Sequence, residues 1–169
     1  MSLSNLSPEF TLLDMVRCEC FSYQADLLRA MVQMGVVKVT PDGNGHTALM
    51  DAAAENTDPL YSQTLIEVGS DVNAKDSKGM TALMYGALAN NNPDVLEVLI
   101  KAGAVVDERD NEGNTALMLA ARDSKIPEML EVLVRNGADP SLVNNEGKSA
   151  LELLGPGEEK AAKLLSGRQ

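Results

Sequence analysis

The chain has 169 residues, of which 44% are hydrophobic, and a formal net charge of −11 at pH 7. This length is enough for one domain with its own core, and the negative charge disfavours binding to nucleic acids and to anionic membranes. Aromatic residues make up only 3% and Trp is absent, so Ala, Leu, Val and Met supply most of the apolar surface, as is typical of closely packed helices.

The N-terminal part of the chain contains its only two cysteines, Cys18 and Cys20. Two cysteines cannot form a disulfide framework, and a zinc site would need about four ligands. The only histidine, His46, lies on another segment, so we expect no metal and no other cofactor. The opening MSLSNLSPEF lacks the basic and apolar regions of a secretion signal, and no apolar run reaches the ~18 residues that span a bilayer. The sequence therefore predicts a cytoplasmic protein.

A six-residue stretch recurs every 34 residues, as GHTALM from Gly45, GMTALM from Gly79, GNTALM from Gly113 and, more loosely, GKSALE from Gly147. Other residue types keep the same register, namely Asp42, Asp76, Asp110 and Asn144; Pro59, Pro93 and Pro127; and Gly35, Gly69, Gly103 and Gly137. A fixed period of this length indicates a repeat protein whose units stack on one another.

Each unit predicts the same elements in the same order. The Thr or Ser before Ala-Leu, as at Thr81, predicts the N-cap of a first helix. Pro93 and its equivalents suit the first turn of a second helix, where a missing N–H costs nothing. Gly103 and its equivalents then predict a left-handed residue after that helix, and the following stretch, such as GAVVDERDNEG, predicts a hairpin-like turn.

The unit from Asp110, DNEGNTALMLAARDSKIPEMLEVLVRNGADPSLVN, resembles an ankyrin repeat, whose pattern is D-x-x-G-x-T-P-L-H-x-A-A, a loop, an apolar second helix and G-A-D-V-N. The resemblance covers about residues 7 to 169 and implies an all-α repeat, an ankyrin-type α-solenoid of about five helix-loop-helix units joined by hairpin-like turns. In three units Ala replaces the family's Pro and Met50, Met84 or Met118 replaces its His. A Met at this position can only pack, so it cannot supply the hydrogen bonds by which that His is expected to link repeats.

We expect one solenoid domain with repeats of unequal regularity. The expected parts are a leader at 1–6 that need not be ordered, a degenerate N-terminal capping repeat at 7–41, ankyrin repeats at 42–75, 76–109 and 110–143, and a C-terminal capping repeat at 144–169. The two terminal units would present the polar outer faces that a solenoid needs at its ends.

The sequence contains no set of residues that indicates catalysis. His46 occupies a variable turn position, and no nucleophile elbow, phosphate-binding loop or metal motif is present. We therefore expect a protein that is not an enzyme.

The resemblance implies a protein–protein interaction module that binds a partner protein on the concave face formed by hairpin tips and first helices. Carried over to the variable positions of this chain, the partner-binding residues are His46, Asp51, Lys75, Lys78, Met80, Tyr85, Leu88, Arg109, Glu112, Asn114, Leu119 and Arg122. Met80, Tyr85 and Leu88 would form an apolar centre with a charged rim, as in many protein interfaces, although Tyr85 and Leu88 could also simply fill the space between repeats.

The identity of the partner does not follow from the sequence, but we expect a monomer that binds no nucleic acid and no membrane. Two alternatives remain open. The chain could be the targeting or regulatory fragment of a larger enzyme or effector. It could also be a structural, self-associating element, for which Phe10, Phe21 and Tyr23 of the first unit would provide the surface.

Overall fold

The computed structural model describes residues 41–55, 57–123 and 126–167. Within these ranges the chain folds into helices α3 to α10 and contains no strand, so the prediction of an all-α repeat solenoid is confirmed. The expected leader and nearly all of the expected N-terminal capping repeat, with both cysteines, lie outside the described residues. None of the described helices is long and apolar enough to cross a membrane.

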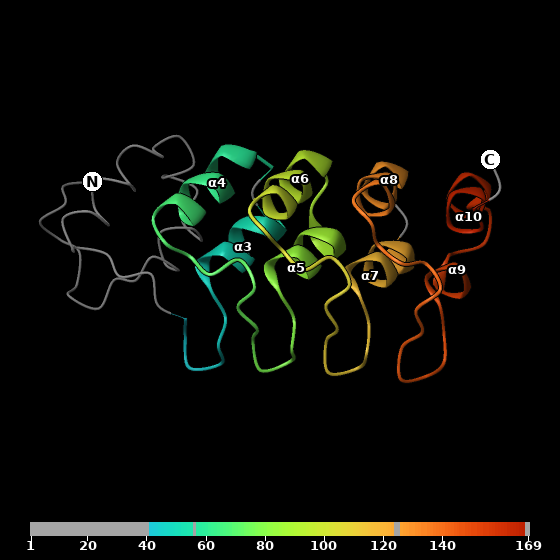
Figure 1. The fold of residues 1–169 in the computed structure, drawn as a ribbon, viewed down its shortest axis with the longest axis horizontal. Helices are drawn as coiled ribbons and strands as arrows, with labels where there is room; N and C mark the ends of the chain where they lie inside the picture. The colour runs from blue at the N-terminus through green and yellow to red at the C-terminus, as the bar shows by residue number, and fades with distance from the viewer. Residues whose placement is uncertain (1–40, 56, 124–125, 168–169) are drawn as a thin grey trace, which may run out of the picture.

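The helices lie in two layers that run along the length of the molecule (Figure 1). The first helix of each unit lies in one layer, which holds α3 (Ala48–Glu55), α5 (Ala82–Ala89), α7 (Ala116–Asp123) and α9 (Ala150–Leu153). The second helix lies in the other layer, which holds α4 (Pro59–Glu67), α6 (Pro93–Lys101), α8 (Pro127–Arg135) and α10 (Glu159–Leu165). The loops that precede α5, α7 and α9 all project to the same side, away from both layers (Figure 1).

The helices begin at the residues that the repeat predicts. Thr81 is the N-cap of α5, and its Oγ1 accepts a hydrogen bond from the backbone N–H of Met84 at 3.4 Å. The three longer second helices start with Pro at the first or second position, as α6 does at Pro93. The short α9 begins differently, because the Ser149 N–H and hydroxyl both donate to the carboxylate of Glu152 at 2.8 Å.

The second helices end in a left-handed glycine, as predicted. Gly103 follows α6 with φ +95°, and its N–H donates to the carbonyl of Ile100 at 2.9 Å. The next N–H, that of Ala104, reaches back to the carbonyl of Leu99 at 3.1 Å. These two bonds are the Schellman arrangement that satisfies the last carbonyls of a helix. Gly69 and Gly137 close α4 and α8 with the same pair of bonds.

The core runs between the two layers and between neighbouring units. Met50, Met84 and Met118 are each no more than 1% exposed, so the residues that replace the family's His pack in the core, as expected. Other side chains link the units instead, since Asn90 Nδ2 donates to the carbonyl of Ala53 at 2.7 Å. The hydrogen bonding between repeats is thus not lost but made by different residues.

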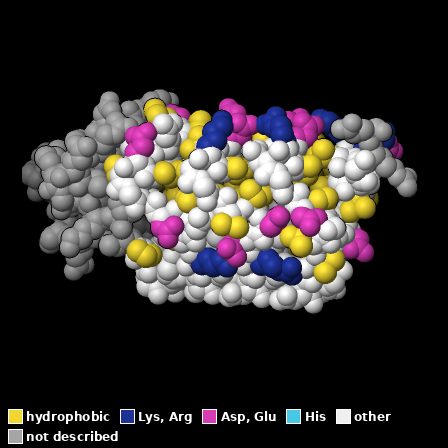
Figure 2. Space-filling model, viewed as in Figure 1, with side chains coloured by type: hydrophobic (Ala, Val, Ile, Leu, Met, Phe, Trp, Pro, Cys, Tyr) yellow, Lys and Arg dark blue, Asp and Glu magenta, His cyan; other side chains and the backbone are white. Residues whose placement is uncertain are grey.

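Charged side chains of both signs cover the second helices. On the face shown in Figure 2, acidic and basic groups alternate along the edge formed by α4, α6 and α8. Ion pairs join neighbouring second helices, from Glu97 on α6 to Arg135 on α8 and from Glu131 on α8 to Lys160 on α10. Hydrogen bonding to Lys101, together with the nearby charge of Arg135, lowers the pKa of Glu97.

Candidate functional site

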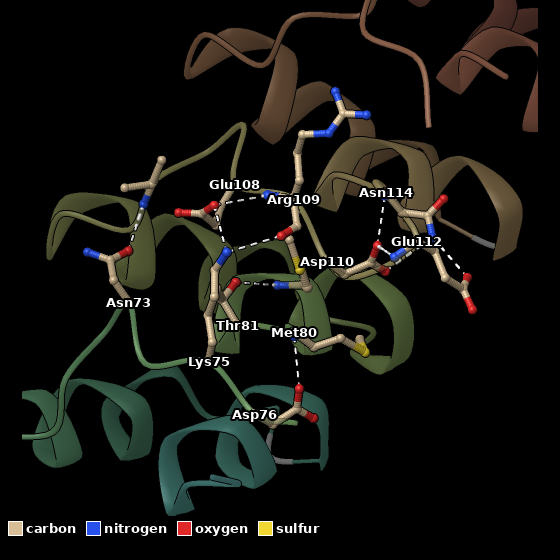
Figure 3. Close-up of polar contacts among 12 residues, drawn as sticks. Asn73, Lys75, Asp76, Met80, Thr81, Glu108, Arg109, Asp110, Glu112 and Asn114 are labelled. Atoms are coloured by element: carbon tan, nitrogen blue, oxygen red, sulfur yellow. Dashed lines mark hydrogen bonds and ion pairs between the residues drawn. The ribbon is translucent and has the colours of Figure 1, made fainter. Parts of the chain in front are cut away.

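The hairpin-like turns are built around one side chain at the start of each turn. Asp76 Oδ1 accepts hydrogen bonds from the backbone N–H groups of Lys78 and Met80, both at 2.9 Å (Figure 3 shows the second of these). Asp110 and Asn144 each hold the corresponding two N–H groups of their own turns. The recurring Asp is therefore a turn residue, and it fixes the positions from which the variable side chains project.

The turns are joined to one another at their tips. One backbone hydrogen bond links each turn to the next, from Ser77 N–H to Asn44 O at 2.7 Å, from Asn111 N–H to Lys78 O at 2.9 Å and from Asn145 N–H to Glu112 O at 2.9 Å. Because these bonds recur at every described junction, the tips form one continuous row along the solenoid.

A groove lies between the second and third described turns and the first helices beside them. Its volume is about 400 Å³, which is within the range of ligand-binding pockets. The residues that line it are Ser77, Lys78, Met80, Leu88, Asp110, Asn111, Glu112, Asn114, Leu119 and Arg122. Seven of the twelve residues predicted to bind a partner line this groove, namely Lys78, Met80, Leu88, Glu112, Asn114, Leu119 and Arg122.

Burial divides these groove residues into a floor and a rim. Met80 and Leu119 are 8% and 2% exposed and belong to the core, and Asn114 is 4% exposed. Leu88 is partly buried against the same core. The side chains of Lys78, Glu112 and Arg122 are exposed around them. The position of a residue in the repeat did not reveal this difference, because burial depends on how the next unit covers it.

Two of the predicted cations link neighbouring units and do not line the groove. Lys75 Nζ donates to Glu108 Oε1 at 2.8 Å and to the carbonyl of Arg109 at 3.1 Å (Figure 3). The hydrogen bond from Lys75 lowers the pKa of Glu108. The guanidinium of Arg109 in turn donates to the carbonyl of Val143 in the following unit.

The remaining predicted residues, His46, Asp51 and Tyr85, form a polar cluster with Asp76 across two units. His46 Nε2 lies 2.7 Å from Asp51 Oδ1, and Asp51 is only 7% exposed. The His46 ring meets the ring of Tyr85 edge to face, with 5.0 Å between centroids. The Tyr85 hydroxyl donates to Asp76 Oδ2 at 2.8 Å. Burial, reinforced by the hydrogen bond and the charge of Asp76, raises the pKa of Tyr85 to about 12.

This cluster makes stability sensitive to alkaline pH. Because the folded-state pKa of Tyr85 is raised above its ordinary value of 10.0, Tyr85 stabilises the fold fully below pH 10 and loses this contribution as pH rises toward about 12. We expect the difference in tyrosinate absorbance between wild type and Tyr85→Phe, measured directly after a pH jump, to titrate near 12. In Asp76→Asn the midpoint should fall. Asn144 shows that Asn can hold such a turn, so we expect this variant to keep the turn and to remove only the negative charge. A Tyr85 midpoint near 10 would contradict the assigned contact.

Three groove residues were not assigned to the site from the sequence, namely Ser77, Asp110 and Asn111. Of these, Asp110 is the charged one. It occupies the recurring turn position and accepts the hydrogen bonds of the turn, and it also lines the groove. The repeat pattern predicts only the first of these roles. Its Oδ2 accepts from Asn114 Nδ2 at 3.1 Å (Figure 3). The described residues include no group of three His, Cys, Asp or Glu side chains that could hold a metal ion.

Helix pairs stacked in two layers, with a row of linked turns and a groove beside it, define a helical repeat protein of the solenoid class. The family model for ankyrin repeats, which spans three copies, matches residues 20–110, 62–144 and 87–167. Together these matches cover most of the chain, so it belongs to the ankyrin-repeat family. A comparison with curated proteins found no match. Ankyrin repeats are generally protein–protein interaction modules and are typically non-catalytic.

Proposed function

We propose that this chain is a non-catalytic module that binds a partner protein on the face formed by its turn tips and first helices. The observation that supports this best is the groove of about 400 Å³, which has an apolar floor of Met80 and Leu119 and a charged rim. A desolvated apolar centre surrounded by polar groups is the arrangement in which protein interfaces concentrate their binding energy.

The burial of the groove residues determines which substitutions can test this proposal. Met80 and Leu119 are almost completely buried, so truncating them would weaken the core as well as the binding face. Exposed positions separate the two effects. Ser77 and Glu112 at the turn tips are both exposed and line the groove.

The test is affinity purification from the native host with quantitative mass spectrometry. We expect a partner recovered with the wild type to be lost, by about tenfold or more, with Ser77→Trp/Glu112→Trp, because two bulky side chains would obstruct the groove whatever the charge of the partner. The control is Gln63→Trp/Asp94→Trp, which places the same side chains at exposed positions on α4 and α6. A partner lost with the control and retained with the face variant would instead place binding on the second helices.

The other expected properties are part of the same proposal. We infer a monomeric protein that acts in the cytoplasm. The surface considered for self-association, Phe10, Phe21 and Tyr23, lies outside the described residues. Sedimentation at high protein concentration tests the monomer directly, since a self-associating element would give a concentration-dependent mass.

A further inference from the structure

The acidic side chains of the groove already have hydrogen-bond donors from the protein. Asp110 Oδ1 accepts from the backbone N–H groups of Glu112 and Asn114 at 2.9 and 2.7 Å, and its Oδ2 accepts from the amide of Asn114. That amide also donates to Glu112 Oε2 at 3.2 Å (Figure 3). These bonds compensate much of the negative charge from within the groove.

The positive charges of Lys78 and Arg122 in the same groove are not compensated by contacts with other described residues. Among the described residues, no ion pair or hydrogen bond involves the ammonium of Lys78 or the guanidinium of Arg122. Most cations of the described part are engaged otherwise, with carboxylates as at Lys75, Lys101 and Lys148, or with a carbonyl as at Arg109. Lys78 and Arg122 therefore stand out by lying in one groove with their donors available.

The groove that holds these two cations also offers apolar side chains. Both residues line the groove together with Met80, Leu88 and Leu119. Met80 and Leu119 are nearly buried, and Leu88 is partly buried against the same core. A ligand that fills the groove must therefore offer an apolar group to the floor and a negative charge to the rim.

We propose that the groove accepts an acidic segment of the partner protein, with an apolar side chain on the Met80–Leu119 floor and Asp or Glu carboxylates on Lys78 and Arg122. This inference rests on the proposed function and specifies the partner's chemistry. A guanidinium can bind a carboxylate through two parallel hydrogen bonds, which gives both affinity and orientation. The formal net charge of −11 repels long polyanions at a distance, so the groove favours a short segment over a nucleic acid.

The test is a selection of random short peptides displayed on phage, followed by binding measurements with the selected peptides in fluorescence polarisation. We expect the selected sequences to combine Asp or Glu with a neighbouring apolar residue. Each of Lys78→Glu and Arg122→Glu should weaken their binding about tenfold or more, because reversing a charge adds repulsion to the loss of a hydrogen bond. Lys163→Glu is the matched control, since it reverses one exposed cation of α10 that also has no ion pair among the described residues.

Three results would overturn the inference. The first is a set of peptides without enriched acid, or peptides whose binding falls equally in the control. The second is tighter binding of single-stranded RNA than of any selected peptide. The third is the absence of selected peptides although the purified partner binds the face, which would mean that the face recognises a folded surface. In that last case the proposed function stands and only the acidic segment is wrong, so the two failures are distinguishable.

Discussion

Leu96→Ala should lower the free energy of unfolding by about 3 kcal/mol, as is typical when a buried Leu leaves a cavity. Leu96 lies in α6 and is 0% exposed within the central described unit. We expect this loss in urea denaturation followed by circular dichroism. The control is Leu60→Ala on α4, where the side chain is 50% exposed and the loss should stay below about 1 kcal/mol.

Gly86 allows a second test of how closely Leu96 is packed. A Cβ at Gly86 in α5 would lie 2.9 Å from Leu96 Cδ2, and the equivalent positions in α3 and α7 are Ala52 and Ala120. Gly86→Ala should therefore destabilise the wild type, because the buried Leu96 has little room to move. In the Leu96→Ala background the same change should stabilise by about 1 kcal/mol, since Ala is the better helix former. Additive effects in this double-mutant cycle would contradict the close contact.

The regular part of the fold could be predicted because its signals are local. Thr81 and Pro93 mark the starts of helices, and Gly103 marks an end, through the conformation of a few neighbouring residues. These signals recur in each unit, so the stacking into a solenoid followed from the period alone.

The site could be predicted only in part, because variable positions have two roles. Variation between units predicts recognition of a partner, and the positions of Lys78 and Arg122 in the groove are consistent with that prediction. Asn114 has a different role. Its Oδ1 accepts from Asn144 Nδ2 at 2.9 Å, and Asn144 is the residue that replaces the recurring Asp in the last turn. Asn114 therefore accepts a hydrogen bond from the amide that Asn144 carries in place of the usual carboxylate.

In the polar cluster of His46, Asp51, Tyr85 and Asp76, variable residues likewise contact other residues of the protein. Tyr85 of one unit donates to Asp76 of its own turn, and the Tyr85 ring contacts His46 of the unit before. The contact between His46 and Tyr85 depends on the distance between units and cannot be inferred from a single repeat. The charged groove residues whose side-chain polar atoms have no such contact among the described residues are Lys78 and Arg122, so their donors are available to a partner.

The contact between successive turns predicts a second large effect, at Gly113. This residue has φ +79°, and a Cβ there would lie 2.5 Å from Asn145 Oδ1 and 3.0 Å from Asn145 N, in the next turn. Gly113→Ala should therefore cost about 3 kcal/mol, from the left-handed backbone and from displacement of the Asn145 and Arg109 side chains and of the neighbouring turn. Thermal or urea unfolding measures this loss.

Gly147 provides the matched control, because it has nearly the same backbone without the same neighbour. Its φ is +76°, and a Cβ would meet nothing within 4 Å. Gly147→Ala should cost only the backbone contribution of about 1 kcal/mol. The difference between the two variants measures the contacts of a Cβ at Gly113 with Asn145 of the next turn and with Arg109 Nη2, which would lie 2.9 Å away. Equal losses at Gly113 and Gly147 would contradict the close contact between successive turns. The continuous row of turn tips, on which the proposed binding face depends, would then be wrong.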